Sequence, residues 1–325
     1  MTVNSLSLEQ FAFRLQHAPG IGPASIRKIL GRIKSADLAV SEILDLDEKI
    51  LFSEFGLSPE TLRTIIDPST RTLALWDSIT EKGIVLRVLG FDGYPKRLEA
   101  VLGRTAPPIL YLLGNEKLFD SCSVGFCGSR KASDKGIEVA TSCGDILAKQ
   151  SINVVSGYAA GVDTATHIAA IKAGGSTIIV LPTGVLHFRI KEEIFAEFTD
   201  DDTSQILVIS EFPPGMPWKA HNAMARNRTI IGLSTVMIVI ESGLEGGTFE
   251  AGKAALSLGV PLFCIEYAEP PLSAPGNAYF LGHGAVAVRR SSNGLPNVSK
   301  ILDSVYMSCD RSVKPIDQPE FAFPS

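Results

Sequence analysis

Three short segments of the sequence combine glycine with hydroxyl or arginine side chains where an apolar run gives way to a helical pattern. They are GSRKAS at 128–133, SGYAAGVD at 156–163 and MARNRTIIGLS at 224–234. Glycine lets backbone N–H groups approach an anion, and arginine forms paired hydrogen bonds with phosphate. In an open α/β sheet, phosphorylated ligands bind where a strand ends and a helix begins. The order and spacing of the segments therefore predict one composite anion site.

Each segment supplies several candidate ligands for phosphate, and a fourth turn adds more. The candidates are Gly128, Ser129, Arg130 and Lys131, then Ser156, Gly157 and Gly161, then Arg226, Asn227 and Arg228, and finally Gly246, Gly247 and Thr248 in the turn GLEGGTFE. Taken singly, each turn is explained equally well by local structure. Arg226 and Arg228 cannot face the same way on a helix, so we expect one to enter the pocket and the other to pair elsewhere.

Three ionisable residues near these turns have a structural and a functional interpretation. Asp163 is placed to cap the helix that carries His167, and a histidine there is more often packed or solvated than catalytic. Glu250 lies in the first turn of a predicted helix, where a carboxylate is stabilised by the helix dipole. Beside a phosphate-binding arginine, the same carboxylate could act on the sugar of a nucleotide.

The composition is that of a protein with a substantial core. Of the 325 residues, 45% are apolar and 20% are charged, and the longest apolar runs are far shorter than the roughly 20 residues of a membrane helix. The first ten residues lack the basic start and apolar core of a signal peptide. We therefore expect a cytoplasmic protein with no membrane contact.

Cysteine usage and net charge exclude two classes of site. The five cysteines are an odd number without a C-x-x-C pair, so we expect no zinc site, no other metal site and no disulfide framework. Cys127 and Cys264 lie in apolar runs and are expected to be buried. A net charge of −5 argues against coating nucleic acid by bulk electrostatics, although a local basic pocket remains compatible with it.

Hydrophobic periodicity divides the chain into a helical part and an α/β part. Residues 8–66 show helical spacing, interrupted by PGIGP at 19–23, and the turn at 67–70 predicts a boundary. Beyond it, predicted strands lie at 85–89, 123–127, 153–155, 177–181, 206–209, 236–240 and 262–265, and predicted helices between them include 135–149, 163–173, 226–233 and 247–258. This alternation predicts a doubly wound, mostly parallel sheet with helices on both faces. Residues 291–325 form a short tail in which 298–307 is expected to be helical.

Residues 94–288 resemble the DNA-processing protein A family (DprA, also called Smf). The resemblance rests on an ordered set of motifs: YPKRL at 94–98, PPILYLLGN at 107–115, GSRKAS, SGYAAGVD, AGGSTIIVLPTGV at 173–185, SEFPPG at 210–215, RNRTIIGLS and GNAYFLGHGAVAV at 276–288. It implies an extended Rossmann-like domain, here 71–290, after a small all-α domain, here 1–70, of SAM or helix-hairpin-helix type. The customary C-terminal winged-helix domain is not expected in this chain.

The resemblance also implies a function. It implies binding of single-stranded DNA, protection of incoming DNA and loading of a RecA-type recombinase in natural transformation, by a homodimer that is not an enzyme and needs no cofactor. The candidate residues named above would then surround the DNA backbone. In PGIGP, Gly20 and Gly22 either point N–H groups at a phosphate or allow two helices to pack.

The chain departs from the family pattern at three places in the predicted pocket. Ala160 stands where an arginine is usual, Ala223 lies near the place of an aromatic residue, and Glu245-Gly246-Gly247 with Glu250 replaces a Ser-Gly-Ser turn followed by threonine. Losing the aromatic residue removes a base-stacking platform, a role that Trp218 or Phe188 is available to take.

Two alternative functions remain open at this level. The first is a nucleotide-binding protein or an N-glycosidic hydrolase of the related LOG-type superfamily, in which Arg226 and Glu250 would be the catalytic pair. The second is a scaffold with a vestigial pocket, whose helical domain serves protein contacts.

Overall fold

The first part of the chain is helical. The structure, a computed structural model, describes residues 6–190 and 202–311. Its first helices are α1 (Leu8–Gln16), α2 (Pro23–Ala36), α3 (Val40–Leu44), α4 (Glu48–Ile50), α5 (Pro59–Ile66) and α6 (Thr70–Glu81), with a π-helical turn η2 (Leu51–Phe55). Ser7, Ser58 and Ser69 accept hydrogen bonds from the first turns of α1, α5 and α6, which fixes where these helices begin.

The glycines between α1 and α2 are explained by backbone conformation. Gly20 has a φ of +71°, which favours glycine, whereas Gly22 is the N-cap of α2. A Cβ atom added at either position would meet no atom within 4 Å. Close packing of the two helices therefore does not require these glycines.

The rest of the chain builds a single sheet from the strands described. They are β1 (Val85–Val88), β2 (Ile109–Gly114), β3 (Ser123–Cys127), β4 (Asn153–Ser156), β5 (Thr177–Leu181), β6 (Ile206–Ser210), β7 (Val236–Val239), β8 (Leu262–Ile265) and β9 (Val286–Val288). Their order is β1-β2-β6-β5-β4-β3-β7-β8-β9. β1 and β2 pair antiparallel, as do β2 and β6, and all strands from β6 to β9 run parallel. The predicted mostly parallel α/β sheet is confirmed.

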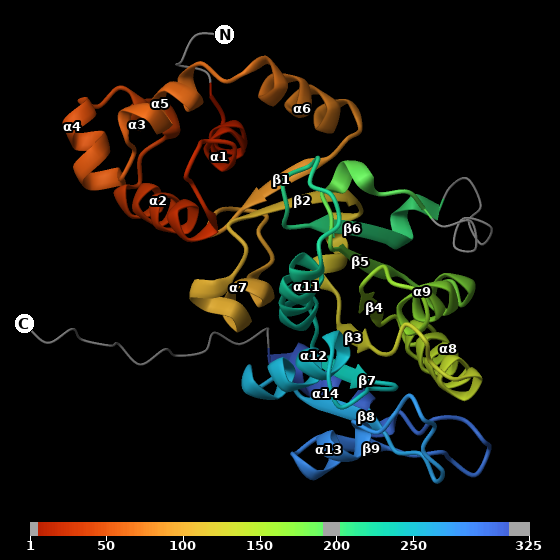
Figure 1. The fold of residues 1–325 in the computed structure, drawn as a ribbon. Helices are drawn as coiled ribbons and strands as arrows, with labels where there is room; N and C mark the ends of the chain where they lie inside the picture. Colours follow the sequence, from red (N-terminus) through yellow and green to blue (C-terminus); the bar gives the residue numbers. More distant parts are fainter. Residues whose placement is uncertain (1–5, 191–201, 312–325) are drawn as a thin grey trace, which may run out of the picture.

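Helices cover both faces of this sheet (Figure 1). One face packs against α7 (Lys96–Leu102), α11 (Ala220–Leu233), α12 (Gly247–Ser257) and α13 (Asn277–Gly282). The other packs against α8 (Asp134–Ala148), α9 (Val162–Lys172) and α14 (Ser299–Arg311). Single-turn 3-10 helices η3 (Gly103–Thr105), η4 (Glu116–Asp120), η5 (Val185–His187) and η6 (Asp202–Gln205) complete the connections.

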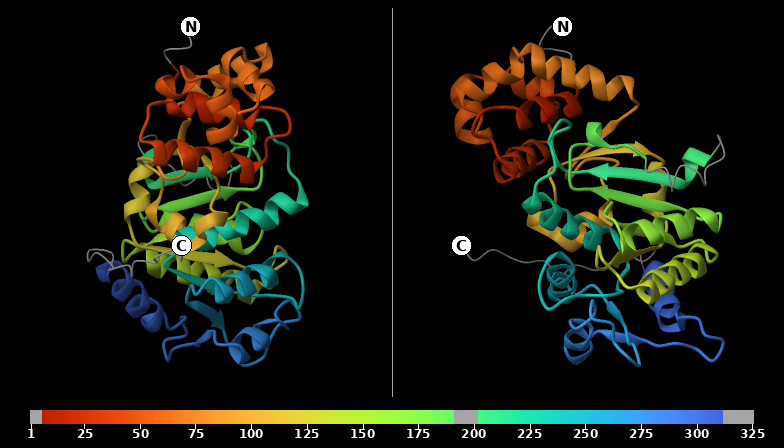
Figure 2. Two further views of the ribbon diagram at one scale, coloured as in Figure 1. Left: turned by 90° about the vertical axis from the view of Figure 1, so that its left-hand side faces the viewer. Right: turned by 45° about the vertical axis from the view of Figure 1, so that its right-hand side comes forward.

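The N-terminal helices and the antiparallel end of the sheet share one hydrophobic core. Successive side chains of β2 point to opposite faces of the sheet and so pack into two different hydrophobic cores. Ile109 and Tyr111 belong to the core formed with α1, α2 and α5, whereas their neighbours in the strand pack against α7 and α11. The Tyr111 hydroxyl donates to Gln16 Oε1 at 2.5 Å. Figure 2 shows the helices of residues 8–81 at one end of the molecule and the segment around β9 at the other. The helical core thus extends beyond the turn at 67–70 to include α6, and the exact domain boundary stays a prediction.

Most strands and helices lie where periodicity predicts them, within one residue at each end. The exceptions are α11, which starts at Ala220 rather than Arg226, α14, which ends at Arg311 rather than Met307, and the unpredicted strands β2 and β9. β2 follows two prolines and is buried on both faces, so it lacks the alternation that identifies a half-exposed strand. β9 has three residues, too few for any periodicity.

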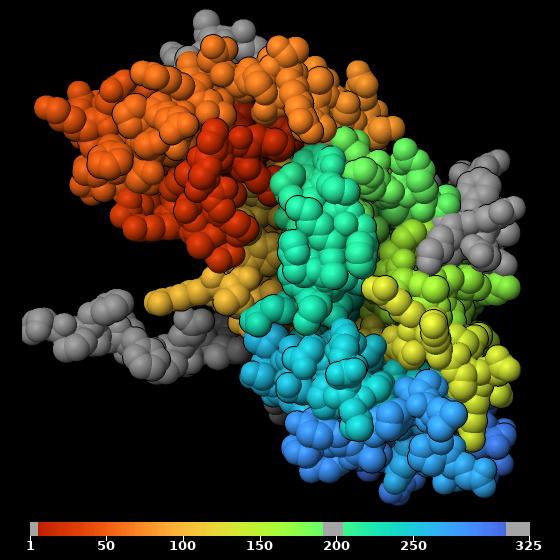
Figure 3. All heavy atoms as spheres, viewed as in Figure 1, coloured from red at the N-terminus to blue at the C-terminus, as the bar shows by residue number. Residues whose placement is uncertain are grey.

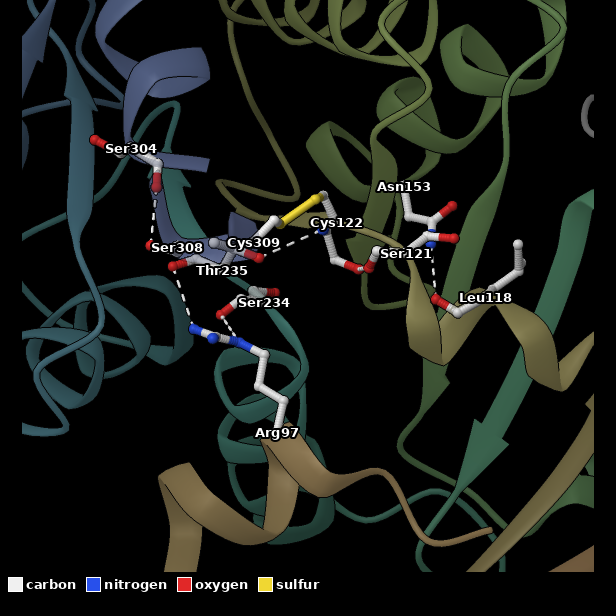
Figure 4. The surroundings of a disulfide bond; sticks show 11 residues. Arg97, Leu118, Ser121, Cys122, Asn153, Ser234, Thr235, Ser304, Ser308 and Cys309 are labelled. Carbon is white, nitrogen blue, oxygen red and sulfur yellow. Dashed lines mark hydrogen bonds between the residues drawn. A yellow bond between two sulfur atoms is a disulfide. The ribbon is translucent and has the colours of Figure 1, made fainter. Parts of the chain in front are cut away.

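The C-terminal helix corrects the expectation about cysteines. Cys122 and Cys309 form a disulfide with Cα atoms 6.2 Å apart and a sequence separation of 187, so the expectation of no disulfide was wrong. A pairing over this distance leaves no local spacing signal. Figure 4 shows this bond joining the end of α14 to the segment before β3. Cys127, Cys143 and Cys264 are free and buried, as predicted for Cys127 and Cys264.

Candidate phosphate-binding pocket

The pocket lies where the strand order reverses. From β3 the chain proceeds to β4, β5 and β6 on one side of the sheet, and then returns to β7 on the other side of β3. The turns that follow β3 and β7 therefore diverge at the carboxyl edge of the sheet, where open α/β sheets bind their ligands. They enclose a cavity of about 740 Å³ together with the first half of α11. In Figure 3, the yellow atoms near residue 130, the teal segment before α11 and the cyan atoms near residue 245 adjoin on the face shown.

The turn after β3 presents donors to this cavity. Gly128, Ser129, Arg130 and Lys131 all line it, and the two cationic side chains are exposed. The turn is held in place because Ser129 N donates to the carbonyl of Glu241 after β7, at 2.9 Å, and Lys131 N donates to Ser129 Oγ at 3.1 Å.

The turn after β4 packs against the first turn and adds Ala159 to the lining of the cavity. Gly161 has a φ of +80°, and an added Cβ would lie 2.5 Å from the carbonyl oxygen of Ser129. Gly161 therefore allows the two turns to pack against each other. Ser156 is fully buried, and its Oγ lies 3.0 Å from Asp163 Oδ1.

Asp163 closes the turn that precedes its own helix. Gly161, not Asp163, is the N-cap of α9, and Asp163 instead accepts from Ala159 N at 3.3 Å. Its side chain is buried and lines the cavity. His167 is fully buried, with Nε2 2.6 Å from the Gly157 carbonyl and Nδ1 2.6 Å from Thr177 Oγ1. This is the environment of a histidine packed in the core.

Arg226 is the buried cation of the pocket. It is 4% exposed and lines the cavity, and its Nη1 donates to the carbonyl of Val180 at 2.9 Å. Its Nε has no hydrogen-bond partner among the residues described. Gly157 makes room for this side chain, because an added Cβ there would overlap the guanidinium group. A buried cation with an unused donor at a cavity is suited to bind an anion.

The charges around Arg226 compete with its burial. Burial lowers the pKa of Arg226, nearby Asp163 and Glu211 act to raise it, and Arg130 acts to lower it. Burial raises the pKa of Glu211, opposed by the hydrogen bond from Thr229 and by Arg226. These two carboxylates therefore help to keep Arg226 charged in the core.

Arg228 points away from the cavity, as one of the two arginines must. Its Nη2 donates to Thr105 Oγ1 at 3.1 Å, next to η3, and the residue does not line the pocket. Asn227 lies between them and does line the pocket, with Nδ2 donating to the carbonyl of Gly247 at 3.1 Å. The prediction of opposite directions is confirmed, and Arg226 is the inward arginine.

The turn after β7 brings Gly247 and Thr248 to the cavity but leaves Glu250 outside it. Gly246 is the N-cap of α12, with a φ of +92°, and positions the turn without lining the cavity. Glu250 is exposed and pairs with Lys253 at 3.3 Å. Glu245 is the carboxylate that this turn adds to the lining.

Large apolar side chains form part of the rim. Trp218 is 53% exposed, and Met224 and Leu272 are also exposed while lining the cavity. Of the two aromatic residues that could replace a stacking platform, Trp218 is at the pocket, whereas Phe188 packs against Tyr158 with ring centroids 5.4 Å apart. Neither Met224 nor Leu272 was predicted at the rim: Met224 begins the segment MARNRTIIGLS but carries no phosphate-binding group, and Leu272 belongs to no motif.

The structure brings together eight of the thirteen predicted phosphate ligands. They are Gly128, Ser129, Arg130, Lys131, Arg226, Asn227, Gly247 and Thr248. Ser156, Gly157, Gly161 and Gly246 shape the turns, and Arg228 is directed elsewhere. Within residues 6–190 and 202–311, no cluster of three histidine, cysteine, aspartate or glutamate residues could hold a metal ion, and no helix is long and apolar enough to cross a membrane.

A family model for the DNA recombination-mediator protein A matches residues 86–298, which include the whole pocket. The chain belongs to this family. Among curated relatives, it is 35% identical over 175 residues to the DNA processing protein DprA of Streptococcus pneumoniae, covering 54% of this chain and 60% of that protein. It is 28% identical over 236 residues to protein Smf of Escherichia coli, covering 71% and 61%. The match to protein Smf of Synechocystis spans 58% of that relative, so the chain aligns with about three fifths of each of these relatives.

Solved structures of the family share the fold. The X-ray structure of DprA from Streptococcus pneumoniae matches with a TM-score of 0.69 and 25% identity, covering 87% of this chain and 95% of that one. DNA processing protein A from Helicobacter pylori, a structure described as showing its single-stranded DNA binding mode, matches with a TM-score of 0.54 and 23% identity over 68% of this chain and 94% of that one. At 23% identity, the similarity to the Helicobacter pylori protein shows a shared fold and nothing more.

Proposed function

We propose that this protein binds single-stranded DNA in the pocket between the β3 and β7 turns and acts as a recombination mediator. The observation that carries the proposal is the buried Arg226, which has an unpartnered Nε among the residues described and lines a cavity together with Arg130 and Lys131. A phosphate of the DNA backbone would accept from these cations and from the N–H groups of the β3 turn.

The rim of the pocket supports a single strand over a free phosphate or a duplex. Trp218 exposes an aromatic face next to the cations, and every unpaired base can stack on such a face. In a duplex the faces of the bases are occupied by stacking on one another. A site that combines cations with an exposed indole therefore suits an unpaired strand.

The finer parts of the proposal rest on the family. Membership supports delivery of the bound strand to a RecA-type recombinase, protection of incoming DNA during transformation, and a homodimer in the cytoplasm. Recombinase loading is tested by measuring whether the protein speeds DNA-dependent ATP hydrolysis by a RecA-type recombinase on strands covered with single-stranded DNA-binding protein. Light scattering after size exclusion tests the dimer.

Nucleotide hydrolysis does not form part of this proposal. The hydrolytic alternative needs Arg226 and Glu250 at one substrate, whereas Glu250 is exposed and paired with Lys253, and does not line the cavity. Incubation with nucleoside monophosphates should release no base, and release that is lost in Glu250→Gln would favour the hydrolase.

The decisive experiment is fluorescence anisotropy with a labelled oligothymidylate at low salt. Arg226→Met and Arg130→Ala should each weaken binding by at least about tenfold, since a charged hydrogen bond contributes about 1.5–3 kcal/mol. Arg228→Ala is the matched control, because this arginine lies on the same helix but bonds Thr105 outside the pocket. Circular dichroism must show that the variants are folded. If Arg228→Ala abolished binding while the folded Arg226→Met variant still bound the oligonucleotide, the proposal that DNA binds in this pocket would be rejected.

A further inference from the structure

The disulfide lies at the opposite edge of the sheet from the phosphate pocket. Cys122 directly precedes β3, and Cys309 lies near the end of α14. β3 and β7 begin at this edge and end at the pocket. Figure 4 shows the sulfur bridge beside Thr235, at the start of β7. Nothing in the proposed DNA site uses this region.

The last turn of α14 is less buried than the turns before it, and the disulfide lies there. Ile301 and Val305 are fully buried against the sheet. Ser308 and Cys309 lie three and four residues after Val305 on the same face of the helix, but they are only half-buried. Tyr306 and Met307 are exposed. The covalent bond therefore stands where the next buried side chain of the helix would be.

The disulfide is open to a reagent from outside. A cavity of about 740 Å³ is lined by both Cys122 and Cys309. By contrast, Cys127, Cys143 and Cys264 are buried, at 9%, 0% and 0% exposure. The chain thus holds two cysteines that a solute can reach and three that it cannot.

The walls of this cavity carry more positive than negative charge. Arg87 forms a salt bridge with Glu116 at 2.8 Å, so these two charges compensate each other. The other charged residues in the wall are the cations Lys96, Arg97 and Lys117 and the anion Asp120. Arg97 is fixed beside the bridge, since its Nε donates to the Ser234 carbonyl at 2.9 Å and its Nη2 to the Thr235 carbonyl at 3.3 Å. Positive charge stabilises a thiolate, both the one that attacks a disulfide and the one that leaves it.

We propose that Cys122–Cys309 is a thiol–disulfide exchange site for a dithiol reductant, and that its reduction releases the last turn of α14. A thiolate of the reductant attacks one sulfur of the bridge, forms a mixed disulfide and expels the other cysteine as a thiolate. The second thiol of the reductant, as its thiolate, then displaces the first cysteine. The reductant ends as its own disulfide and the protein gains two electrons and two protons as a pair of thiols.

Alkylation of the folded, air-oxidised full chain tests the site, with the three buried cysteines as internal controls. After treatment with dithiothreitol and iodoacetamide without denaturant, peptide mass spectrometry should find Cys122 and Cys309 alkylated and Cys127, Cys143 and Cys264 protected. Omitting dithiothreitol should protect all five. Alkylation of Cys122 and Cys309 without reductant, or only after denaturation, would overturn the proposal.

The role of the charges is tested by comparing an anionic and a cationic thiol. Lys117→Glu should slow reduction by glutathione and speed reduction by cysteamine, and Lys253→Glu, on α12 outside this cavity, should change neither. Equal effects of both variants would show that the cavity does not guide the thiol.

Release of the helix end is read by amide hydrogen exchange. Reduction, or Cys309→Ser, should speed exchange at residues 306–309 and leave exchange at residues 302–305 unchanged, beside the buried Ile301 and Val305. Unchanged exchange at 306–309 would show that packing, not the bridge, holds this turn. Oligonucleotide binding should be the same in both redox states, so this inference and the DNA site can fail independently.

Discussion

In the proposed DNA site, Arg226 would combine a structural and a ligand-binding role in one side chain. Its guanidinium group is enclosed by Asp163 and Glu211, and one nitrogen is bound to the Val180 carbonyl. Removing the cation would leave two carboxylates near each other in the core, which costs stability as well as affinity. Binding assays on Arg226 variants therefore need a measure of folding beside them.

Trp218 gives a cleaner test of ligand contact, because half of its side chain is exposed. We expect Trp218→Ala to weaken oligothymidylate binding about 5- to 150-fold, since stacking contributes about 1–3 kcal/mol per base. Trp218→Phe should restore most of the affinity. Anisotropy titrations at fixed salt measure both, with Phe188→Leu as the control because Phe188 packs on Tyr158 away from the cavity. If Trp218→Ala bound oligothymidylate as tightly as the unmodified protein does, stacking of bases on Trp218 would be excluded.

Glu211 predicts a pH dependence of stability. Burial raises its pKa above the ordinary 4.5, so the folded state holds the proton more tightly than the unfolded state. The free energy of unfolding of the unmodified protein should therefore fall relative to Glu211→Gln as pH rises from about 4.5, and level off above the folded-state pKa. Urea denaturation between pH 4.5 and 7.5 measures this difference. A rise instead would mean that Arg226 outweighs burial and lowers the pKa.

At the scale of elements, the pocket depends on the contact between the β3 and β4 turns. Gly161→Ala would force a side chain into a backbone conformation with φ of +80° and bring its Cβ within 2.5 Å of the Ser129 carbonyl. We expect a loss of about 1–3 kcal/mol in the free energy of unfolding, measured by urea denaturation. Gly31→Ala, at an open position inside α2, should instead stabilise by about 0.5–1 kcal/mol. An equal effect of both substitutions would show that the turn contact is not strained.

The sequence was sufficient for elements whose signal is local. Parallel strands such as β5 and β7 are short apolar runs followed by glycine or hydroxyl turns, and they lie where predicted. Helical spacing predicted that the side chains of Arg226 and Arg228 point in different directions. Which of the two enters the pocket depends on how α11 packs against β5, and the sequence does not show this. The Cys122–Cys309 bridge joins segments that are remote in sequence, so no local pattern could identify it. Trp218 was one of two candidates for stacking, and its place at the rim depends on the fold.

At the scale of the whole molecule, the two cavities occupy opposite ends of the same parallel strands. The phosphate pocket is built from turns after β3 and β7, and the cavity at the disulfide from segments before them. The N-terminal helices pack on β1 and β2, several strands away from the phosphate pocket. The sheet therefore separates the proposed DNA site from the proposed thiol-exchange site, so we expect that each can be altered without rebuilding the other.

The net charge of −5 sets how DNA binding should respond to salt. In the proposed complex an acidic molecule holds DNA mainly through its pocket, where Arg130, Lys131 and Arg226 can neutralise about three phosphates. Release of counterions from a single strand then predicts a slope of about −2 in a plot of log affinity against log salt concentration. Anisotropy titrations from 25 to 200 mM NaCl, in roughly equal logarithmic steps, measure it, and Lys131→Ala should reduce the slope by about one unit or slightly less. A slope steeper than about −4 would require basic residues outside this pocket, and would place most of the DNA on another surface.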